Sequence, residues 1–228
     1  MSKQLTLGLH IPQENTFENF ISSHNHVAVE QLKNSHDIQF TYIYAGPGLG
    51  VSHLLHACCN GAPNNDAIYL DLKQLPKNPA IFEGLCDLSL CCIDHLEAVD
   101  SSATEEALFH LFNRMAAKNN RLIIANKIPC TQANIQLADL KSRLASGNSI
   151  EITEPDEQAK REILKQIAQR CGLELSDECI TYMLTRHARD MSSLIEILRT
   201  LDKAAWIEQR RLSIPFIKQC LTTAPAAI

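Results

Sequence analysis

Hydrophobic positions along the chain gather in five short runs, which are separated by longer stretches with helical spacing. Each run is rich in Ile, Leu, Tyr and Cys and is followed by turn residues or by a helix start. The predicted strands cover residues 40–45, 67–72, 88–94, 121–126 and 149–153. The predicted helices between them cover residues 52–60, 79–85, 103–118 and 137–146. This alternation predicts an α/β fold in which a mainly parallel sheet has helices on both faces.

The pattern changes after Thr153, where only helical segments follow. The first of them lies between Pro155 and Gly172, residues typical of a helix start and a helix end. Ser176 is the expected N-cap of the next one. The expected parts of the chain are an N-terminal segment (residues 1–15), an α/β core (16–154) and a small all-helical lid domain (155–228).

Composition and charge exclude several classes of protein. The chain has 228 residues, of which 45% are hydrophobic, and a net charge of −5, so it carries no general basic face for nucleic acid. The sequence has no apolar run of about 18 residues, and we expect no membrane span. Nine cysteines, two pairs of them adjacent, show neither metal-knuckle spacing nor the even number of a disulfide framework. We therefore expect a cytoplasmic protein with reduced cysteines.

The stretch "GPGLGVSHLL" follows the first predicted strand and leads into the first predicted helix. Gly46, Gly48 and Gly50 let the backbone turn sharply and approach an anion, and the helix that starts near Ser52 offers unpaired N–H groups. Phosphate-binding loops normally carry a lysine before the Ser/Thr, but Val51 stands here. The pattern predicts a phosphate site without its usual cation; an ordinary strand–turn–helix is the alternative.

Histidines follow the loop on the same predicted helix. His53, which comes directly after Ser52, is grouped with the nucleotide-binding residues. His53 and His56 lie one helical turn apart with Cys58 nearby, which raises the alternative of a metal site. The simpler interpretation is ordinary helix side chains, because no third ligand follows at a metal-site spacing.

Two further apolar strands end in polar residues that suit nucleotide chemistry. "LSLCCIDHLE" places Asp94 at a strand end, where it can hold Mg²⁺ together with Ser52. In active ATPases that have a phosphate-binding loop and an aspartate at this strand end, a carboxylate commonly follows the aspartate and polarises the attacking water. His95 occupies that place here, and Glu97 lies two residues further on. "RLIIANK" ends in Asn126, at the position of a sensor for the γ-phosphate. A helix-capping role for Asp94 is the simpler alternative.

Two arginines complete the set of candidate residues. Arg143, in "LKSRLASG", lies on a predicted helix before the fifth strand. It is either a surface salt-bridge residue or an arginine finger that reaches the nucleotide of a neighbouring subunit. Arg189, in "RHARDMSSL", begins the long lid helix and is placed to point back at the phosphates.

In this order, these elements resemble the AAA+ ATPase domain of the bacterial replication initiator DnaA. The likeness includes "TFENF", "GLGVSHLLHA", "LFNRM" and "LKSRL" and extends from about Thr16 to Leu221. It implies an AAA+ P-loop core with a five-stranded mainly parallel sheet and a helical lid. It also implies an adenine nucleotide, with ADP favoured, and Mg²⁺ at Ser52 and Asp94 when nucleotide is bound. DnaA continues into a helix-turn-helix DNA-binding domain, which we do not expect here.

The N-terminal stretch "QLTLGL" is a polar amide followed by leucines. As an extended peptide it places Gln4 in a polar pocket and Leu7 and Leu9 in an apolar groove, and Leu5 is counted with them among the clamp-binding residues. It resembles the hexapeptide that binds the sliding clamp, the beta subunit of DNA polymerase III; a loose chain start is the alternative. With the core, it resembles DnaA-related regulators that inactivate DnaA after replication has begun.

The resemblance implies a regulator of chromosomal replication initiation that meets DNA mainly through the clamp. Arg143 would promote hydrolysis of DnaA-bound ATP in trans and so prevent re-initiation, while Val51 and His95 argue against independent ATPase activity. The alternatives are an autonomous weak ATPase, a DnaA-like loader or adaptor on single-stranded DNA, and a passive bridge between clamp and DnaA. Whether the protein forms a homo-oligomer is left open.

Overall fold

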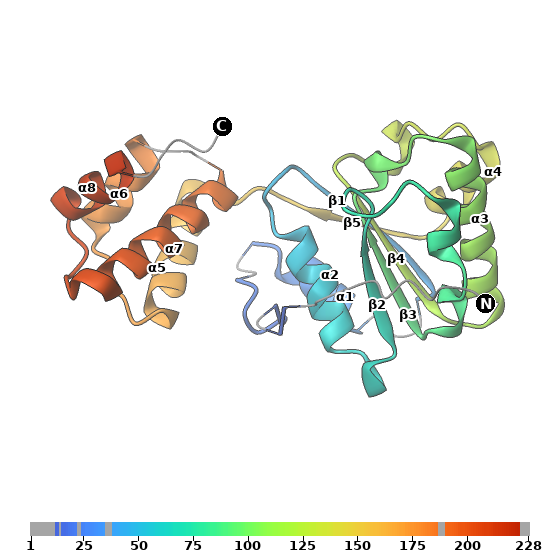
Figure 1. The fold of residues 1–228 in the computed structure, drawn as a ribbon, viewed down its shortest axis with the longest axis horizontal. Helices are drawn as coiled ribbons and strands as arrows, with labels where there is room; N and C mark the ends of the chain where they lie inside the picture. The colour runs from blue at the N-terminus through green and yellow to red at the C-terminus, as the bar shows by residue number, and fades with distance from the viewer. Residues whose placement is uncertain (1–11, 14, 22–23, 35–37, 187–189, 224–228) are drawn as a thin grey trace. The chain divides into compact units, whose positions relative to one another are not determined.

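The computed structural model describes residues 12–13, 15–21, 24–34, 38–186 and 190–223. Its contacts divide the chain into two units, Met1–Thr153 and Glu154–Ile228. The first unit contains a five-stranded sheet in the order β2-β3-β4-β1-β5, and all four strand pairings are parallel (Figure 1). The strands are β1 (Phe40–Ala45), β2 (Ala67–Asp71), β3 (Leu90–Asp94), β4 (Arg121–Asn126) and β5 (Asn148–Ile152). The predicted parallel α/β sheet is thus confirmed.

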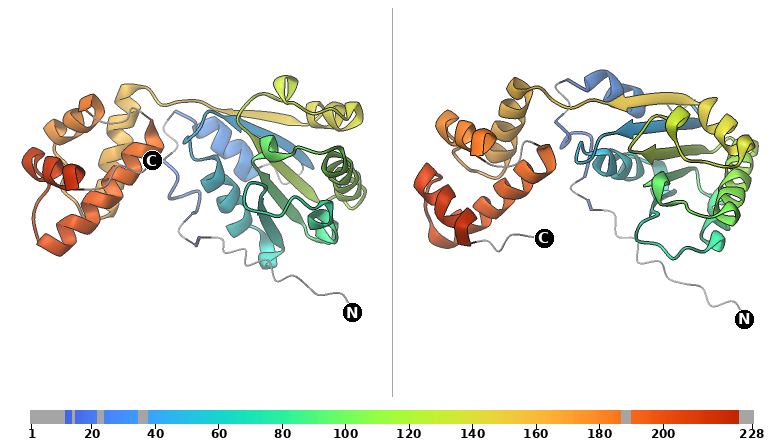
Figure 2. Two further views of the ribbon diagram at one scale, coloured as in Figure 1. Left: turned by 45° about the horizontal axis from the view of Figure 1, so that its top comes forward. Right: turned by 90° about the horizontal axis from the view of Figure 1, so that it is seen from above.

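Helices cover both faces of this sheet (Figures 1 and 2). Successive strand residues point to opposite faces of the sheet. Tyr42 and Ile124 therefore belong to the core between the sheet and one pair of helices. Ile43 and Ile123 belong to the core between the sheet and the other pair. The first pair is α3 (Ser102–Ala117) and α4 (Ala138–Ala145), and the second is α1 (His26–Asn34) and α2 (Val51–Asn60). Burial on both faces explains why the central strands β3 and β4 are nearly continuous apolar runs, whereas the edge strand β5 alternates between buried and exposed residues.

Two local elements differ from the sequence-based prediction. Helix α1 has no counterpart among the predicted elements; it is held by buried Val29 and Leu32. The predicted helix over residues 79–85 is wrong, because the chain forms two short 3₁₀ turns there, η2 (Pro79–Phe82) and η3 (Leu85–Asp87). Gly84 lies between them at φ +77°, a left-handed conformation that ends any regular helix. Further 3₁₀ turns are η1 (Pro63–Asn65), η4 (Leu96–Ala98) and η5 (Cys130–Gln132).

The second unit is all-helical in its described part, as expected of the lid. Its helices are α5 (Glu157–Arg170), α6 (Asp177–Arg186), α7 (Met191–Glu208) and α8 (Ile214–Thr223). Ser176 caps α6 as predicted, because its hydroxyl oxygen accepts a hydrogen bond from the Cys179 N–H at 3.3 Å. Asp190 caps α7 in the same way through the Ser193 N–H. Within the described ranges, every helix is too short or too polar to cross a membrane.

Candidate nucleotide site and a distant arginine

The glycine-rich loop connects the carboxyl end of β1 to the start of α2. Gly48 and Gly50 have φ values of +76° and +82°, which other residues rarely adopt. A Cβ at Gly50 would also lie 2.7 Å from Cε2 of Phe20. Helix α2 begins at Val51, so its unpaired N–H groups and positive dipole end lie at the loop. Val51 itself is half-buried and packs against the core under α2, which leaves loop position 51 without a cation.

Asp94, at the end of β3, is 4% exposed and lies against this loop. Its Oδ2 accepts hydrogen bonds from the Ser52 hydroxyl at 2.6 Å and from the Tyr69 hydroxyl at 2.9 Å. Its Oδ1 accepts a third from the His95 N–H at 2.8 Å. The predicted meeting of loop serine and strand-end aspartate is therefore present in the geometry. Tyr69 is an additional partner that the sequence did not indicate, because β2 reaches β3 only through sheet pairing.

Beyond Asp94, Glu97 is enclosed by basic side chains. Its Oε1 lies 3.1 Å from Lys73 Nζ, 3.2 Å from Lys127 Nζ and 3.1 Å from Nδ1 of His95. Partial burial alone would raise the pKa of Glu97, but the hydrogen bonds from these three residues and from its own backbone lower that pKa to about 2. A carboxylate held in this way is not free to polarise an attacking water molecule. Neither lysine was predicted, since both follow strand ends far apart in the chain.

Asn126 ends β4 at the same edge of the sheet, where it pairs in register with Tyr44 of β1. Its side chain is buried: Nδ2 donates to the Tyr42 hydroxyl at 2.9 Å, and Oδ1 accepts from the Lys127 N–H at 2.8 Å. The amide is thus oriented by two partners next to the loop. Sensing of a phosphate by Asn126 remains a prediction.

The oxygen donors at this edge fit a Mg²⁺ ion shared with nucleotide phosphates. Mg²⁺ prefers oxygen ligands and commonly takes only one or two from protein carboxylates and hydroxyls, and Ser52 and Asp94 supply such a pair at 2.6 Å from each other. In the described part of the chain, no group of three His, Cys, Asp or Glu side chains is able to hold a metal ion alone. Phosphate oxygens would have to complete the coordination.

The histidines of α2 have structural partners. His53 Nε2 lies 2.8 Å from the Thr16 carbonyl oxygen. His56 Nδ1 lies 2.9 Å from the Asn15 side-chain nitrogen, and its ring packs against the Tyr69 ring at an interplanar angle of 59°, with 4.1 Å between the centroids. Burial lowers the pKa of His56. These contacts tie α2 to the segment before it and to β2, which agrees with the interpretation as ordinary helix side chains.

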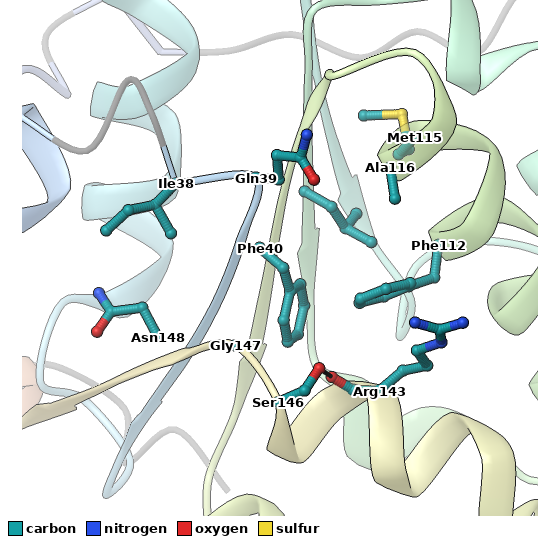
Figure 3. A pocket seen from close by; sticks show the side chains of 11 residues that line it. Ile38, Gln39, Phe40, Phe112, Met115, Ala116, Arg143, Ser146, Gly147 and Asn148 are labelled. Atoms are coloured by element: carbon teal, nitrogen blue, oxygen red, sulfur yellow. Dashed lines mark hydrogen bonds between the residues drawn. The ribbon is translucent and has the colours of Figure 1, made fainter.

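Arg143 lies at the opposite edge of the sheet from the loop. It lines a pocket of about 350 Å³ together with Phe40, Leu122 and Asn148, which stand at the beginnings of three parallel strands (Figure 3). Strands of five or six residues separate the two edges by roughly 17–20 Å. Arg143 is exposed on the last turn of α4, and no carboxylate of the described residues forms a salt bridge with it. The alternative of a salt-bridge residue is thus not supported.

Five residues of the predicted sites lie outside the described residues. They are Gln4, Leu5, Leu7 and Leu9 of the N-terminal stretch and Arg189 before α7. Their predicted roles stay predictions from the sequence.

Comparisons with known proteins agree with this architecture. Residues 11–151 match the family described as the bacterial DnaA ATPase domain, and residues 156–221 match "Hda, lid domain". A relative from Haemophilus influenzae, described as an uncharacterized protein, is 38% identical over 97% of this chain and 99% of its own length.

Solved structures show the same fold at lower identity. Domain III of the Thermotoga maritima replication initiation protein DnaA covers 92% of this chain and 96% of its own, with 19% identity and a TM-score of 0.77. AMPPCP-bound DnaA from Aquifex aeolicus covers 87% and 67%, with 22% identity and a TM-score of 0.70. The Thermotoga maritima branch-migration motor RuvB covers 93% and 73%, with 15% identity and a TM-score of 0.69. The chain belongs to the DnaA-related AAA+ family of bacterial replication proteins, with a lid domain of the Hda type.

Proposed function

We propose that this protein is a regulator of chromosomal replication initiation that promotes hydrolysis of DnaA-bound ATP through Arg143. The DNA-loaded sliding clamp would recruit it through Gln4, Leu5, Leu7 and Leu9. It would then meet ATP-bound DnaA, one AAA+ domain against the other. Conversion of DnaA to its ADP-bound form would prevent re-initiation.

The observation that carries the proposal is the position of Arg143. The side chain is exposed, has no carboxylate partner among the described residues and stands at the sheet edge away from its own phosphate loop. From there it serves a nucleotide on another subunit better than one on its own chain. An arginine supplied in trans stabilises the charge that develops on the transferred phosphoryl group and is worth about 10³–10⁵ in rate.

The protein's own site supports a role other than steady hydrolysis. Val51 stands where a phosphate-binding loop carries its lysine, so that cation is absent. Glu97 forms ion pairs with Lys73 and Lys127 and a hydrogen bond with His95. The oxygens of Ser52 and Asp94, with Mg²⁺ and the loop N–H groups, would still hold an adenine nucleotide, with ADP favoured. Bound Mg²⁺ would neutralise phosphate charge there. Such a nucleotide would stabilise one conformation of the protein and would not be turned over by it.

The test is hydrolysis of ATP bound to DnaA, followed with and without this protein and DNA-loaded clamp. The parent should stimulate hydrolysis only when the clamp is present. Arg143→Ala should keep clamp binding and most DnaA association but lose the stimulation, because its contribution arises in the transition state. Arg143→Lys should restore little, since a point charge lacks the planar fork of a guanidinium.

A matched control removes the same charge from the neighbouring helix α3. Arg114→Ala should stimulate hydrolysis as the parent does. Stimulation by Arg143→Ala at the parent level would refute the trans mechanism and leave a passive bridge between clamp and DnaA. Steady ATP turnover by the purified chain alone would instead favour the autonomous ATPase.

A further inference from the structure

Helix α3 contacts both ends of the short helix that carries Arg143. At one end, the buried carboxylate of Glu105 accepts hydrogen bonds from the N–H groups of Gln136 at 3.1 Å and Leu137 at 2.7 Å. These two residues lead directly into α4. A carboxylate at this place also faces the positive end of the α4 dipole. The start of α4 is therefore fixed to α3.

At the other end of α4, Arg143 lies over an aromatic ring of α3. Its guanidinium carbon is 5.9 Å from the centroid of the Phe112 ring (Figure 3). A cation over a ring face within about 6 Å is attracted by the ring quadrupole. Phe112 stands seven residues after Glu105, and both belong to the side of α3 that meets α4. Within the described residues, this ring is the only partner of the guanidinium.

The Phe112 ring is itself held by its neighbours. Phe40, at the start of β1, packs against it edge to face, with 4.8 Å between the centroids and an interplanar angle of 63°. The chain passes close to Phe40 on its other side: a Cβ at Gly147 would lie 2.0 Å from Phe40 Cδ1. Only a glycine leaves room for this approach. Gly147, Phe40 and Phe112 thus form a packed series that ends at Arg143.

We propose that Phe112 is a positioning residue for Arg143. The inference rests on the proposed function of Arg143 and adds how this exposed arginine is kept ready for it. A long, exposed arginine samples many rotamers, and ordering it in a transition state costs conformational entropy. Phe112 reduces that cost by confining the guanidinium over its ring before the partner's nucleotide arrives. Phe112 acts through Arg143 and does not touch the nucleotide itself.

The test uses the full chain with DNA-loaded clamp and ATP-bound DnaA. Phe112→Leu keeps an apolar side chain but removes the ring. Its maximal stimulated rate should fall about 2- to 5-fold, the loss expected for one exposed cation–π contact. The protein concentration that gives half-maximal stimulation should stay the same, because docking is unaffected. Phe112→Tyr retains the ring and has the adjoining pocket for its hydroxyl, so it should restore most of the rate.

A matched control separates positioning from stability. Phe82 is also buried and packs on α3, but it lines a different pocket, away from Arg143. Phe82→Leu should leave the stimulated rate unchanged. A second readout is independent of DnaA: the NMR order parameter of the Arg143 Nε–Hε group in the free protein. It should fall in Phe112→Leu and stay at the parent value in Phe82→Leu.

The possible contrary results distinguish failure of the positioning role of Phe112 from failure of the proposed function of Arg143. Equal rates for Phe112→Leu and the parent, or equal losses in Phe112→Leu and Phe82→Leu, would refute positioning by Phe112 while Arg143→Ala still tests the proposed function. An unchanged order parameter in Phe112→Leu would also refute it. Full stimulation by Arg143→Ala would overturn both proposals.

Discussion

Replacement of Glu105 by glutamine tests whether α3 fixes the start of α4. Glu105 is 5% exposed, and its two oxygens accept from Gln136 and Leu137. Glutamine keeps one oxygen acceptor and presents an NH₂ group to the remaining N–H donor. The change therefore removes at least one hydrogen bond to a charged group, worth about 1.5–3 kcal/mol.

The expected effect is a measurable fall in thermal stability. A loss of 1.5–3 kcal/mol corresponds to a Tm lower by about 3–12 °C in a chain of this size. Neutralisation also removes the cost of burying a charge, which places the expected fall in the lower half of that range. The assay is thermal unfolding followed by circular dichroism. Amide hydrogen exchange should show faster exchange at the N–H groups of Gln136 and Leu137 in the variant.

The neighbouring residue supplies a matched control. Glu106 is exposed and its side chain forms no hydrogen bond or salt bridge with the described residues, so Glu106→Gln makes the same chemical change outside the network. An exposed substitution of this kind stays within about 0.5 kcal/mol of the parent. If Glu105→Gln melts and exchanges as Glu106→Gln does, the Glu105 carboxylate does not fix the start of α4 and does not help to position the helix that carries Arg143.

The other predictions concern the loop, the N-terminal stretch and the ion cluster. Val51→Lys should tighten ADP binding about 10-fold or more in calorimetric titration, because it adds a charge-assisted contact to a loop of suitable shape; unchanged binding would count against that shape. Gln4→Ala combined with Leu7→Ala should abolish clamp pull-down without altering the thermal melt, and undiminished pull-down would end the clamp assignment. The pKa of Glu97 is about 2 when folded, below its ordinary value of 4.5, so its ionised form stabilises the fold above about pH 4.5 and this stability is lost as pH falls toward 2. The difference in unfolding free energy between the parent and Glu97→Gln, measured by urea titration, should therefore shrink over that range; a constant difference would show that Glu97 does not titrate in this way.

The sequence by itself determined the strands and most of the helices. Strands β1 and β4 begin and end at the predicted residues, because each contains a four-residue apolar run (residues 42–45 and 122–125) whose polar or glycine neighbours are visible locally. The order of the glycine-rich loop and of the strand-end residues likewise indicated Ser52, Asp94 and Asn126 as candidates. Parallel strands bring their carboxyl ends to one edge, so this part of the site follows from the alternating pattern alone.

Only the tertiary structure decided the features that depend on distant partners. Helix α1 has a weak local signal, and the Asn25 side chain that precedes it pairs with the main chain and hydroxyl of Thr153, 128 residues away. The enclosure of Glu97 by Lys73 and Lys127 depends on strand order in the same way. So does the place of Arg143 over Phe112, since a ring on α3 and a guanidinium on α4 meet only after both helices pack on one face of the sheet. Local spacing sets which elements form, whereas long-range packing sets which side chains they bring together.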